Sequence, residues 1–258
     1  MEVVVRPDVD AAVDLVARLI AARIEAKPDL VIGLATGRTM ERVYDRLVAL
    51  GPSFRRVCSF NLDEYVGLAP DDPQSYRSYM RQHLFDRVDI DLANARLPEV
   101  DGPDLKEVAR RYEADIAAAG GVDLQLLGIG ETGHIGFNEP LSALMSRTRD
   151  KTLTQDTRRQ NAAMFGGDPD RVPSRALTMG VGTILDAREV LLLATGEHKA
   201  HIVAKAIEGP ITSMVTASAL QLHPNCKVVL DEAAAEALQG RDYYDWVFQS
   251  EPDWDDFR

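Results

Sequence analysis

Residues 30–39 read LVIGLATGRT, and this stretch decides the fold. Its apolar half predicts a buried strand of the kind that lies inside a parallel sheet covered on both faces. Gly37 then predicts a tight turn, and a helix follows over residues 38–50. A strand, a glycine turn and a helix N-terminus together present backbone N–H groups to an anion. Phosphate binding is therefore the favoured interpretation, and an ordinary strand-to-helix turn is the alternative.

The same alternation of strands and helices continues along the chain. Apolar residues recur at helical spacing from Val9 to Ile24, and Asp104 with Glu107 resembles a capping box at the start of another helix. This order predicts an α/β protein, a Rossmann-like three-layer α/β/α sandwich with a mainly parallel sheet. We expect a single domain over residues 1–258 with a polar candidate lid around 156–175. Further strands are expected at residues 58–64, 124–130, 175–180, 189–196 and 227–231, the last leading into a helix.

Charge and hydropathy exclude several classes of function. The formal net charge of −12 argues against a nucleic-acid partner, because phosphate backbones are bound by clustered Lys and Arg. A stretch long and apolar enough to span a membrane is missing, and the first residues do not resemble a secretory signal. The two cysteines, Cys58 and Cys226, form neither a metal motif nor a disulfide framework, which suits the cytoplasm.

Polar or glycine-rich sequence follows four of the expected strands. In folds of this kind, ligands bind beyond the carboxyl ends of the strands, so we expect the four segments to share one site. The segment at residues 128–133 also matches a dinucleotide fingerprint by its letters, but it does not open a helix, so that interpretation is disfavoured. The four segments read ATGRT, NLDEY, GIGETGHIGFNEP and ATGEHK.

Two groups of residues are candidates for acid–base chemistry. Asp63 and Glu64 are adjacent after a strand, so only one of them can face the site, and a carboxylate there is a natural base for a proton α to a carbonyl. The alternative is that these carboxylates are solvated charges of a surface loop. Glu139 follows His134 closely, and a carboxylate behind an imidazole fixes its tautomer and raises its basicity. The spacing of these residues does not suggest a metal site.

These strings resemble the glucosamine-6-phosphate deaminase/isomerase family over nearly the whole chain. The resemblance implies a sandwich of the deaminase/ribose-5-phosphate isomerase type, no cofactor, and a sugar 6-phosphate as the small-molecule partner. Members of the family convert glucosamine 6-phosphate to fructose 6-phosphate and ammonia. The matching strings are FNLDEYVGL, GHIGFNEP, SRTRDKTLTQDTR, ALTMGVGTILDAREV and LQLHPN.

The resemblance also implies roles for single residues. Asp63 would move a proton between carbons 2 and 1 of the opened sugar, and His134, oriented by Glu139, would open the pyranose ring. Four further residues, called the allosteric set below, match positions that form an allosteric site at a subunit contact in the hexameric members of the family. A homo-oligomer is therefore one expectation. The resemblance places Gly37, Thr39 and Lys199 around the phosphate, and we expect Thr36 and Arg38 of the same loop to bind substrate as well. The allosteric set is Ser142, Arg149, Lys151 and Thr152.

Three departures from the family pattern affect these roles. Thr132, preceded by Glu131, stands where the family has an Asp that belongs to the ring-opening group. Ala163 aligns with a lid Arg that closes over the phosphate. In the phosphate loop, Arg38 replaces a small residue and Met40 replaces Pro. Our hypothesis is that Arg38 supplies the charge lost at Ala163, because Arg binds phosphate through two hydrogen bonds.

Four functions are compatible with these residues. The first is the family reaction, with loss of ammonia from carbon 2. The second is a dehydratase, in which Asp63 removes the same proton from N-acetylglucosamine 6-phosphate and the carbon-3 hydroxyl leaves as water. Lactone hydrolysis, as in the related 6-phosphogluconolactonases, matches the motifs less well. A non-catalytic sugar-phosphate sensor is the alternative from another class.

Overall fold

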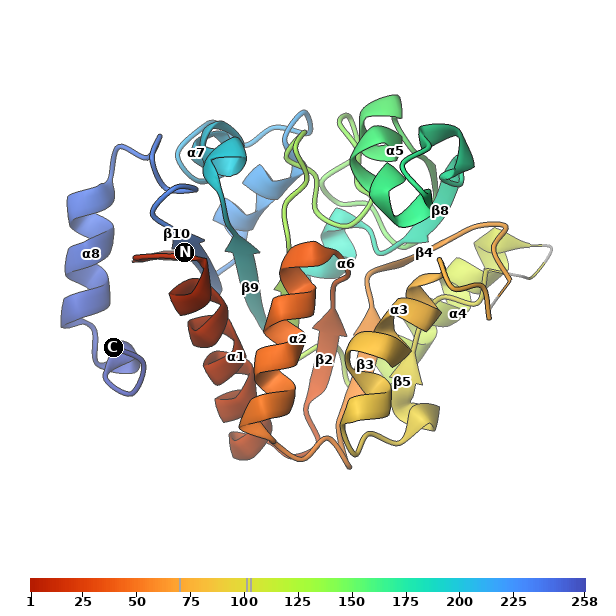
Figure 1. Ribbon diagram of the computed structural model, residues 1–258, viewed down its shortest axis with the longest axis horizontal. Helices are drawn as coiled ribbons and strands as arrows, with labels where there is room; N and C mark the ends of the chain where they lie inside the picture. Colours follow the sequence, from red (N-terminus) through yellow and green to blue (C-terminus); the bar gives the residue numbers. More distant parts are fainter. Residues whose placement is uncertain (70, 101, 103) are drawn as a thin grey trace.

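The computed structural model describes residues 1–69, 71–100, 102 and 104–258. Within them, the main sheet has seven strands in the order β1-β10-β9-β6-β2-β3-β5, and each neighbouring pair is parallel. The expected α/β architecture with a mainly parallel sheet is therefore confirmed (Figure 1). The strands are β1 (Glu2–Arg6), β2 (Val31–Leu34), β3 (Cys58–Asn61), β5 (Ala95–Arg96), β6 (Leu124–Leu127), β9 (Glu189–Ala194) and β10 (Cys226–Asp231).

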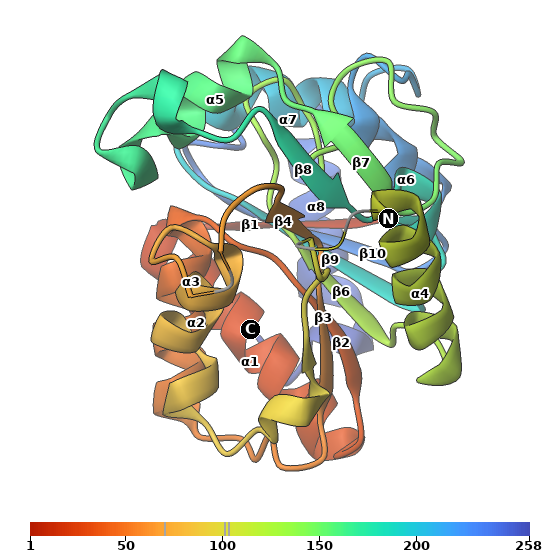
Figure 2. The same cartoon turned by 90° about the vertical axis from the view of Figure 1, so that its right-hand side faces the viewer.

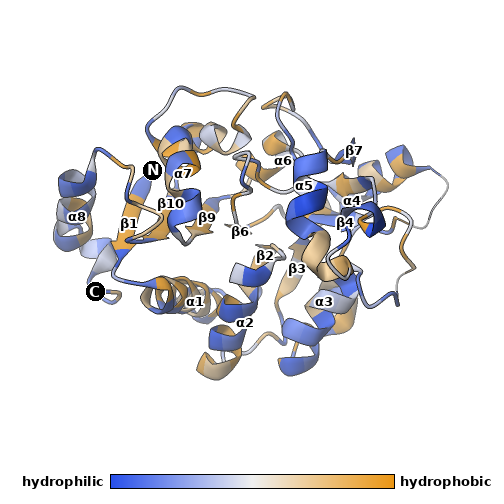
Figure 3. Ribbon diagram, turned by 45° about the horizontal axis from the view of Figure 1, so that its top comes forward, coloured by the Kyte–Doolittle hydropathy of each residue, from blue (hydrophilic) through white to orange (hydrophobic). Residues whose placement is uncertain are grey.

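Helices lie on both sides of this sheet. Figure 2 shows α1 (Val9–Ala26), α2 (Arg38–Leu50) and α3 (Tyr76–His83) on one side, and α4 (Leu105–Ala118) on the other. The carboxylate of Asp104 caps α4 by accepting the N–H groups of Lys106 and Glu107, as the capping pattern predicts. Most residues of β9 and β10 are hydrophobic, whereas the surface helix α5 (Gln155–Asn161) is made of polar residues (Figure 3). No helix in the described residues is long and apolar enough to cross a membrane.

A second, smaller sheet is the main difference from expectation. Its strands β4 (Asp63–Tyr65), β8 (Arg175–Thr178) and β7 (Arg149–Thr152) pair in an antiparallel manner, in the order β4-β8-β7. The expectation of one strand over residues 58–64 is wrong, because the chain leaves the main sheet at Leu62 and Asp63 begins a strand opposite Thr178. The strand expected at 175–180 likewise belongs to the small sheet.

The segment between β7 and β8 is the expected lid region. It contains α5 and two short 3₁₀ helices, Ala162–Phe165 and Pro169–Arg171. In Figure 1 this segment stands above the upper ends of the sheet strands, near the start of α2. Its two ends are held together by the antiparallel pairing of β7 with β8.

The helix expected directly after the last strand is also missing. Residues 232–237 form turns, and the carboxylate of Asp231 accepts the N–H of Ala234 where they begin. The remaining α-helices of the described residues are α6 (Val181–Leu185), α7 (Ala200–Ile207) and α8 (Arg241–Ser250), and short 3₁₀ helices lie between several elements.

Candidate active site

The four strand ends with polar sequence meet at one edge of the sheet. Strands β9, β6, β2 and β3 are consecutive neighbours, and the chain order reverses between β6 and β2. A crevice outside the carboxyl ends of strands at such a switch point is where ligands bind in open α/β sheets. A cavity of about 460 Å³ lies there. Its wall includes Gly37, Arg38, Thr39, Asp63, Gly130, His134, Gln160, Asn161, Ala163 and Lys199.

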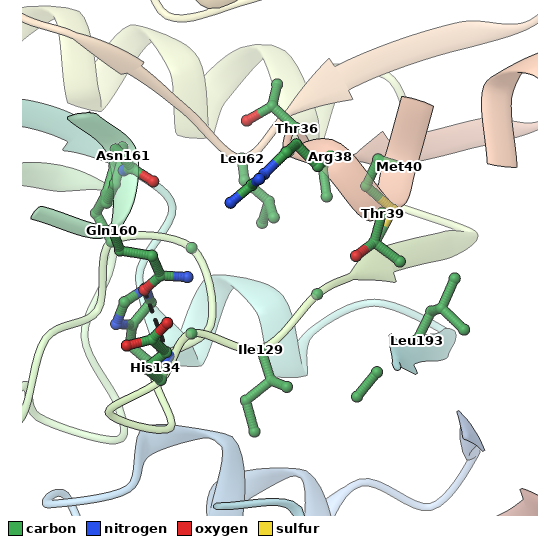
Figure 4. A pocket seen from close by; sticks show the side chains of 18 of the residues that line it. Thr36, Arg38, Thr39, Met40, Leu62, Ile129, His134, Gln160, Asn161 and Leu193 are labelled. Carbon is green, nitrogen blue, oxygen red and sulfur yellow. Dashed lines mark hydrogen bonds between the residues drawn. The ribbon is translucent and has the colours of Figure 1, made fainter. Parts of the chain in front are cut away.

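The turn from β2 into α2 forms one wall of the cavity. Gly37 has φ of 119°, a conformation that favours glycine, and α2 begins at the next residue. Hydrogen bonds among the described residues do not engage the N–H groups of Arg38 and Thr39, so the helix N-terminus is available to an anion. Figure 4 shows the side chains of Arg38 and Thr39 on one side of the pocket, and those of His134 and Gln160 on the other.

Two cationic side chains reach this cavity. Lys199 is buried, and burial lowers the pKa of its ammonium group. Asp231 positions the loop that carries it, because this carboxylate accepts the N–H of Gly196 at 2.9 Å. Among the described residues, neither Lys199 nor the exposed Arg38 has a hydrogen bond or ion pair through its side chain. An unpaired buried ammonium group is costly, so an anion bound in the cavity would stabilise the charged form of Lys199.

The structure separates the roles of the adjacent carboxylates. Asp63 is buried and lines the cavity, whereas Glu64 does not. Glu64 instead accepts the N–H groups of Tyr65 at 2.8 Å, Tyr76 at 2.9 Å and Arg77 at 2.9 Å, and so holds the start of α3. Burial, with the charge of Glu64 as a second cause, raises the pKa of Asp63 well above its usual value. A carboxylate of this kind is a stronger base than an ordinary Asp.

His134 has two partners at the same ring nitrogen. Its Nδ1 atom lies 2.9 Å from Oγ1 of Thr132 and 3.5 Å from Oε2 of Glu139. Burial lowers the pKa of the imidazole, while the charge of Glu139 raises it to a smaller extent. The ring packs directly on Gly130, where a Cβ atom would lie 2.2 Å from Cε1 and Nε2 of the ring. Glycine is therefore required there for His134 to occupy this position.

The lid contributes polar contacts that the sequence did not indicate. Thr154 donates its N–H and its hydroxyl to Oε1 of Glu139, at 3.0 and 3.1 Å. Gln160 accepts the N–H of Glu131 at 3.4 Å, and Asn161 donates to the Tyr65 hydroxyl at 3.0 Å. The contact of Thr154 with Glu139 depends on tertiary structure.

The expected allosteric set lies outside this cavity. The guanidinium of Arg149 donates to Oδ1 of Asn138 at 2.8 Å, and burial lowers its pKa. Ser142 is buried, Lys151 shares a face of β7 with Arg149, and Thr152 is exposed at the end of that strand. The described residues hold no group of three His, Cys, Asp or Glu side chains arranged for a metal ion.

These features define a class: an α/β protein with a small-molecule site at the switch point of a parallel sheet. The family model of glucosamine-6-phosphate isomerases/6-phosphogluconolactonase matches residues 8–229. The chain therefore belongs to this family, as the sequence motifs predict.

Individual relatives agree with this assignment. The chain is 51% identical over 248 residues to a glucosamine-6-phosphate deaminase of Shewanella loihica, covering 95% of this chain and 92% of the relative. It is 47% identical over 260 residues to one of Streptomyces coelicolor, covering 98% and 99%. A solved monomeric glucosamine-6-phosphate deaminase superposes with a TM-score of 0.89 at 42% identity, covering 92% of this chain and 100% of that chain. The 6-phosphogluconolactonase of Trypanosoma cruzi, at 22% identity, a TM-score of 0.74 and coverage of 92% and 97%, shares the fold.

Proposed function

We propose that the protein converts glucosamine 6-phosphate and water to fructose 6-phosphate and ammonia. The observation that carries the proposal is the placement of Asp63 and His134, from separate strand ends, on one cavity that also contains the unpaired Lys199. The similarity to relatives named glucosamine-6-phosphate deaminase extends over 95% or more of the chain and supports the same reaction.

The two acid–base groups suit successive steps of this reaction. With Nδ1 protonated beside Thr132 and Glu139, His134 accepts the proton of the anomeric hydroxyl at Nε2 and returns it to the ring oxygen, which opens the pyranose ring. Asp63 then removes the proton from carbon 2 and returns it to carbon 1, which converts the amino aldehyde to an imine at carbon 2. Water adds to that imine, and ammonia leaves. The raised pKa of Asp63 makes the carboxylate basic enough for the second step.

The phosphate is assigned to the opposite wall of the cavity. Thr36, Gly37 and Thr39 belong to the turn and first turn of α2, and Lys199 faces them from the loop after β9. Arg38 completes this set in our proposal. The position of Ala163 on the lid side of the same cavity supports that view, because the lid offers no cation at that position.

The lid, the allosteric set and the assembly state belong to the same proposal. We assign residues 156–175 as a lid because α5 places Gln160 and Asn161 on the cavity wall. By resemblance, Ser142, Arg149, Lys151 and Thr152 form an effector site in a cytoplasmic homo-oligomer. Gel filtration with light scattering, with and without N-acetylglucosamine 6-phosphate as the probe, tests that part.

Assays on two substrates test the function. We expect purified protein to release ammonia and fructose 6-phosphate from glucosamine 6-phosphate. N-acetylglucosamine 6-phosphate, whose amide nitrogen is a poor leaving group, is assayed for ultraviolet absorbance and for the mass loss of one water. Turnover of only the N-acetyl sugar replaces the deaminase proposal with the dehydratase. Ligand binding without turnover of either sugar supports the sensor, and hydrolysis of 6-phosphogluconolactone alone supports a lactonase.

A further inference from the structure

The carboxylate of Glu139 is shared between the active site and the lid. Its Oε1 atom accepts two hydrogen bonds from Thr154, and its Oε2 atom lies 3.5 Å from Nδ1 of His134. Among the described residues, Oε2 has no hydrogen-bond partner, and Glu139 is only 3% exposed. The orientation of this carboxylate is therefore fixed through Oε1 alone.

Thr154 contacts Oε1 of Glu139 through both its backbone N–H and its hydroxyl. It is the N-cap of α5, and its Oγ1 atom accepts the N–H of Thr157 at 3.2 Å. The Oγ1 atom of Thr157 also lies 3.1 Å from that of Thr154. With its two lone pairs accepting the N–H and the hydroxyl of Thr157, the single proton of Thr154 goes to Oε1 of Glu139. The backbone N–H of Thr154 donates to the same oxygen at 3.0 Å. Two donors on one oxygen restrict the rotation of the carboxylate about its terminal bond.

We propose that Thr154 is a positioning residue for His134, acting through Glu139. By holding Oε1, it aims Oε2 at Nδ1 and favours the tautomer in which Nδ1 carries the proton and Nε2 is a free base. Because Thr154 also caps α5, docking of the lid helix and orientation of the histidine are one event. The role of Thr154 in turnover rests on the proposed function, whereas its effect on the imidazole is measurable without any substrate.

Three variants separate positioning from simple loss of a helix cap. Thr154→Val removes the hydroxyl at nearly constant shape, and Thr154→Ser restores a hydroxyl. The in-lid control is Asp168→Ala, because Asp168 caps the short helix Pro169–Arg171 by accepting the N–H of Asp170 and has no contact with Glu139.

The first measurement is the ¹⁵N spectrum of the histidine rings. The chain has five histidines, and a His134→Gln variant assigns the signals of His134. We expect the Nδ1–H tautomer in the native protein, a mixture of tautomers in Thr154→Val, and the native pattern in Thr154→Ser and Asp168→Ala. A native tautomer pattern in Thr154→Val overturns the proposal, and so does a mixed pattern in the Asp168→Ala control.

The second measurement is turnover of glucosamine 6-phosphate. We expect kcat of Thr154→Val to fall by about ten-fold with little change in KM, since acid–base positioning acts on the chemical step. Thr154→Ser should recover most of that loss. A fall in kcat that Thr154→Ser does not rescue contradicts the proposal. If the native protein releases no ammonia, the proposed function fails, and the ring spectra still decide the positioning role.

Discussion

The hydroxyl oxygen of Thr132 lies 2.9 Å from Nδ1 of His134, closer than the carboxylate of Glu139 at 3.5 Å. A hydroxyl both donates and accepts hydrogen bonds, whereas a carboxylate only accepts them. The imidazole is therefore held by one neutral and one charged partner. One carboxylate, that of Glu139, lies beside Nδ1 among the described residues, and burial lowers the pKa of His134.

Substitution Thr132→Asp should raise the pKa of His134, because a second carboxylate stabilises the imidazolium. The neutral ring is the base, so the acidic limb of kcat/KM should move to higher pH, by about one unit. Above that limb, ring opening and ammonia release should increase. The matched control is Thr132→Asn, which has the same shape without the charge. Equal histidine pKa values in the two variants, measured by NMR titration, would contradict this account.

Substitution Asp63→Asn should abolish turnover and stabilise the protein near neutral pH. The folded-state pKa of Asp63 is raised by burial first and by Glu64 second, so its ionised form opposes folding. Below about pH 4, where the group is protonated in both states, the two proteins should unfold with similar free energy. As pH rises through the folded-state pKa, the native protein should lose stability relative to the variant. Denaturant unfolding across pH checks this; a constant difference would count against it.

Substitution Arg38→Ala should raise KM about ten-fold or more with little change in kcat, because a charge-assisted hydrogen bond contributes roughly 1.5–3 kcal/mol. Adding Ala163→Arg to that variant returns a cation to the lid side of the same cavity and should restore much of the affinity. Inorganic phosphate should inhibit Arg38→Ala more weakly than the native protein, and the double variant should lie between the two. An unchanged KM in Arg38→Ala removes this residue from the phosphate site.

Substitution Glu64→Ala should cost about 2–3 kcal/mol of unfolding free energy, because three backbone N–H groups lose their acceptor, two at the start of α3 and one at Tyr65. Glu64→Gln should cost less, since its carbonyl can replace Oε1, which accepts two of the three bonds. The Gln variant also removes the charge that raises the pKa of Asp63, so the acidic limb of kcat/KM due to Asp63 should move to lower pH. Thermal unfolding and a pH–rate profile test the two effects separately.

Local sequence signals predicted much of this fold. The helix expected over residues 38–50 matches α2 (Arg38–Leu50), and the four polar strand ends do meet at adjacent strands. These features depend on hydrophobic pattern and on glycine turns, which are short-range. Strand β4 was missed because its pairing with β8 joins segments more than a hundred residues apart, and the apolar pattern runs through Leu62 without a break.

The sequence also predicted the candidate site in part. Alternation along an extended chain indicated that only one of Asp63 and Glu64 enters the site, but the N–H groups of α3 that hold Glu64 come from tertiary structure. The contact between Thr154 and Glu139 is also tertiary, because α5 must dock before it forms.

The pairing of β7 with β8 has a consequence for how this family can diversify. Thr152 lies opposite Arg175, so the segment between them starts and ends at neighbouring points of one small sheet. The entropic cost of closing a loop rises only slowly with its length, so the exposed part of this segment can be lengthened or shortened at little entropic cost. Phe165 and Val172 are buried in the core and have to be kept. Asp63 is held by the other edge of β8 and keeps its place throughout. Under the proposed function, variation in the exposed part of this segment after Thr154 is therefore a route to new sugar preferences that leaves Asp63 in place.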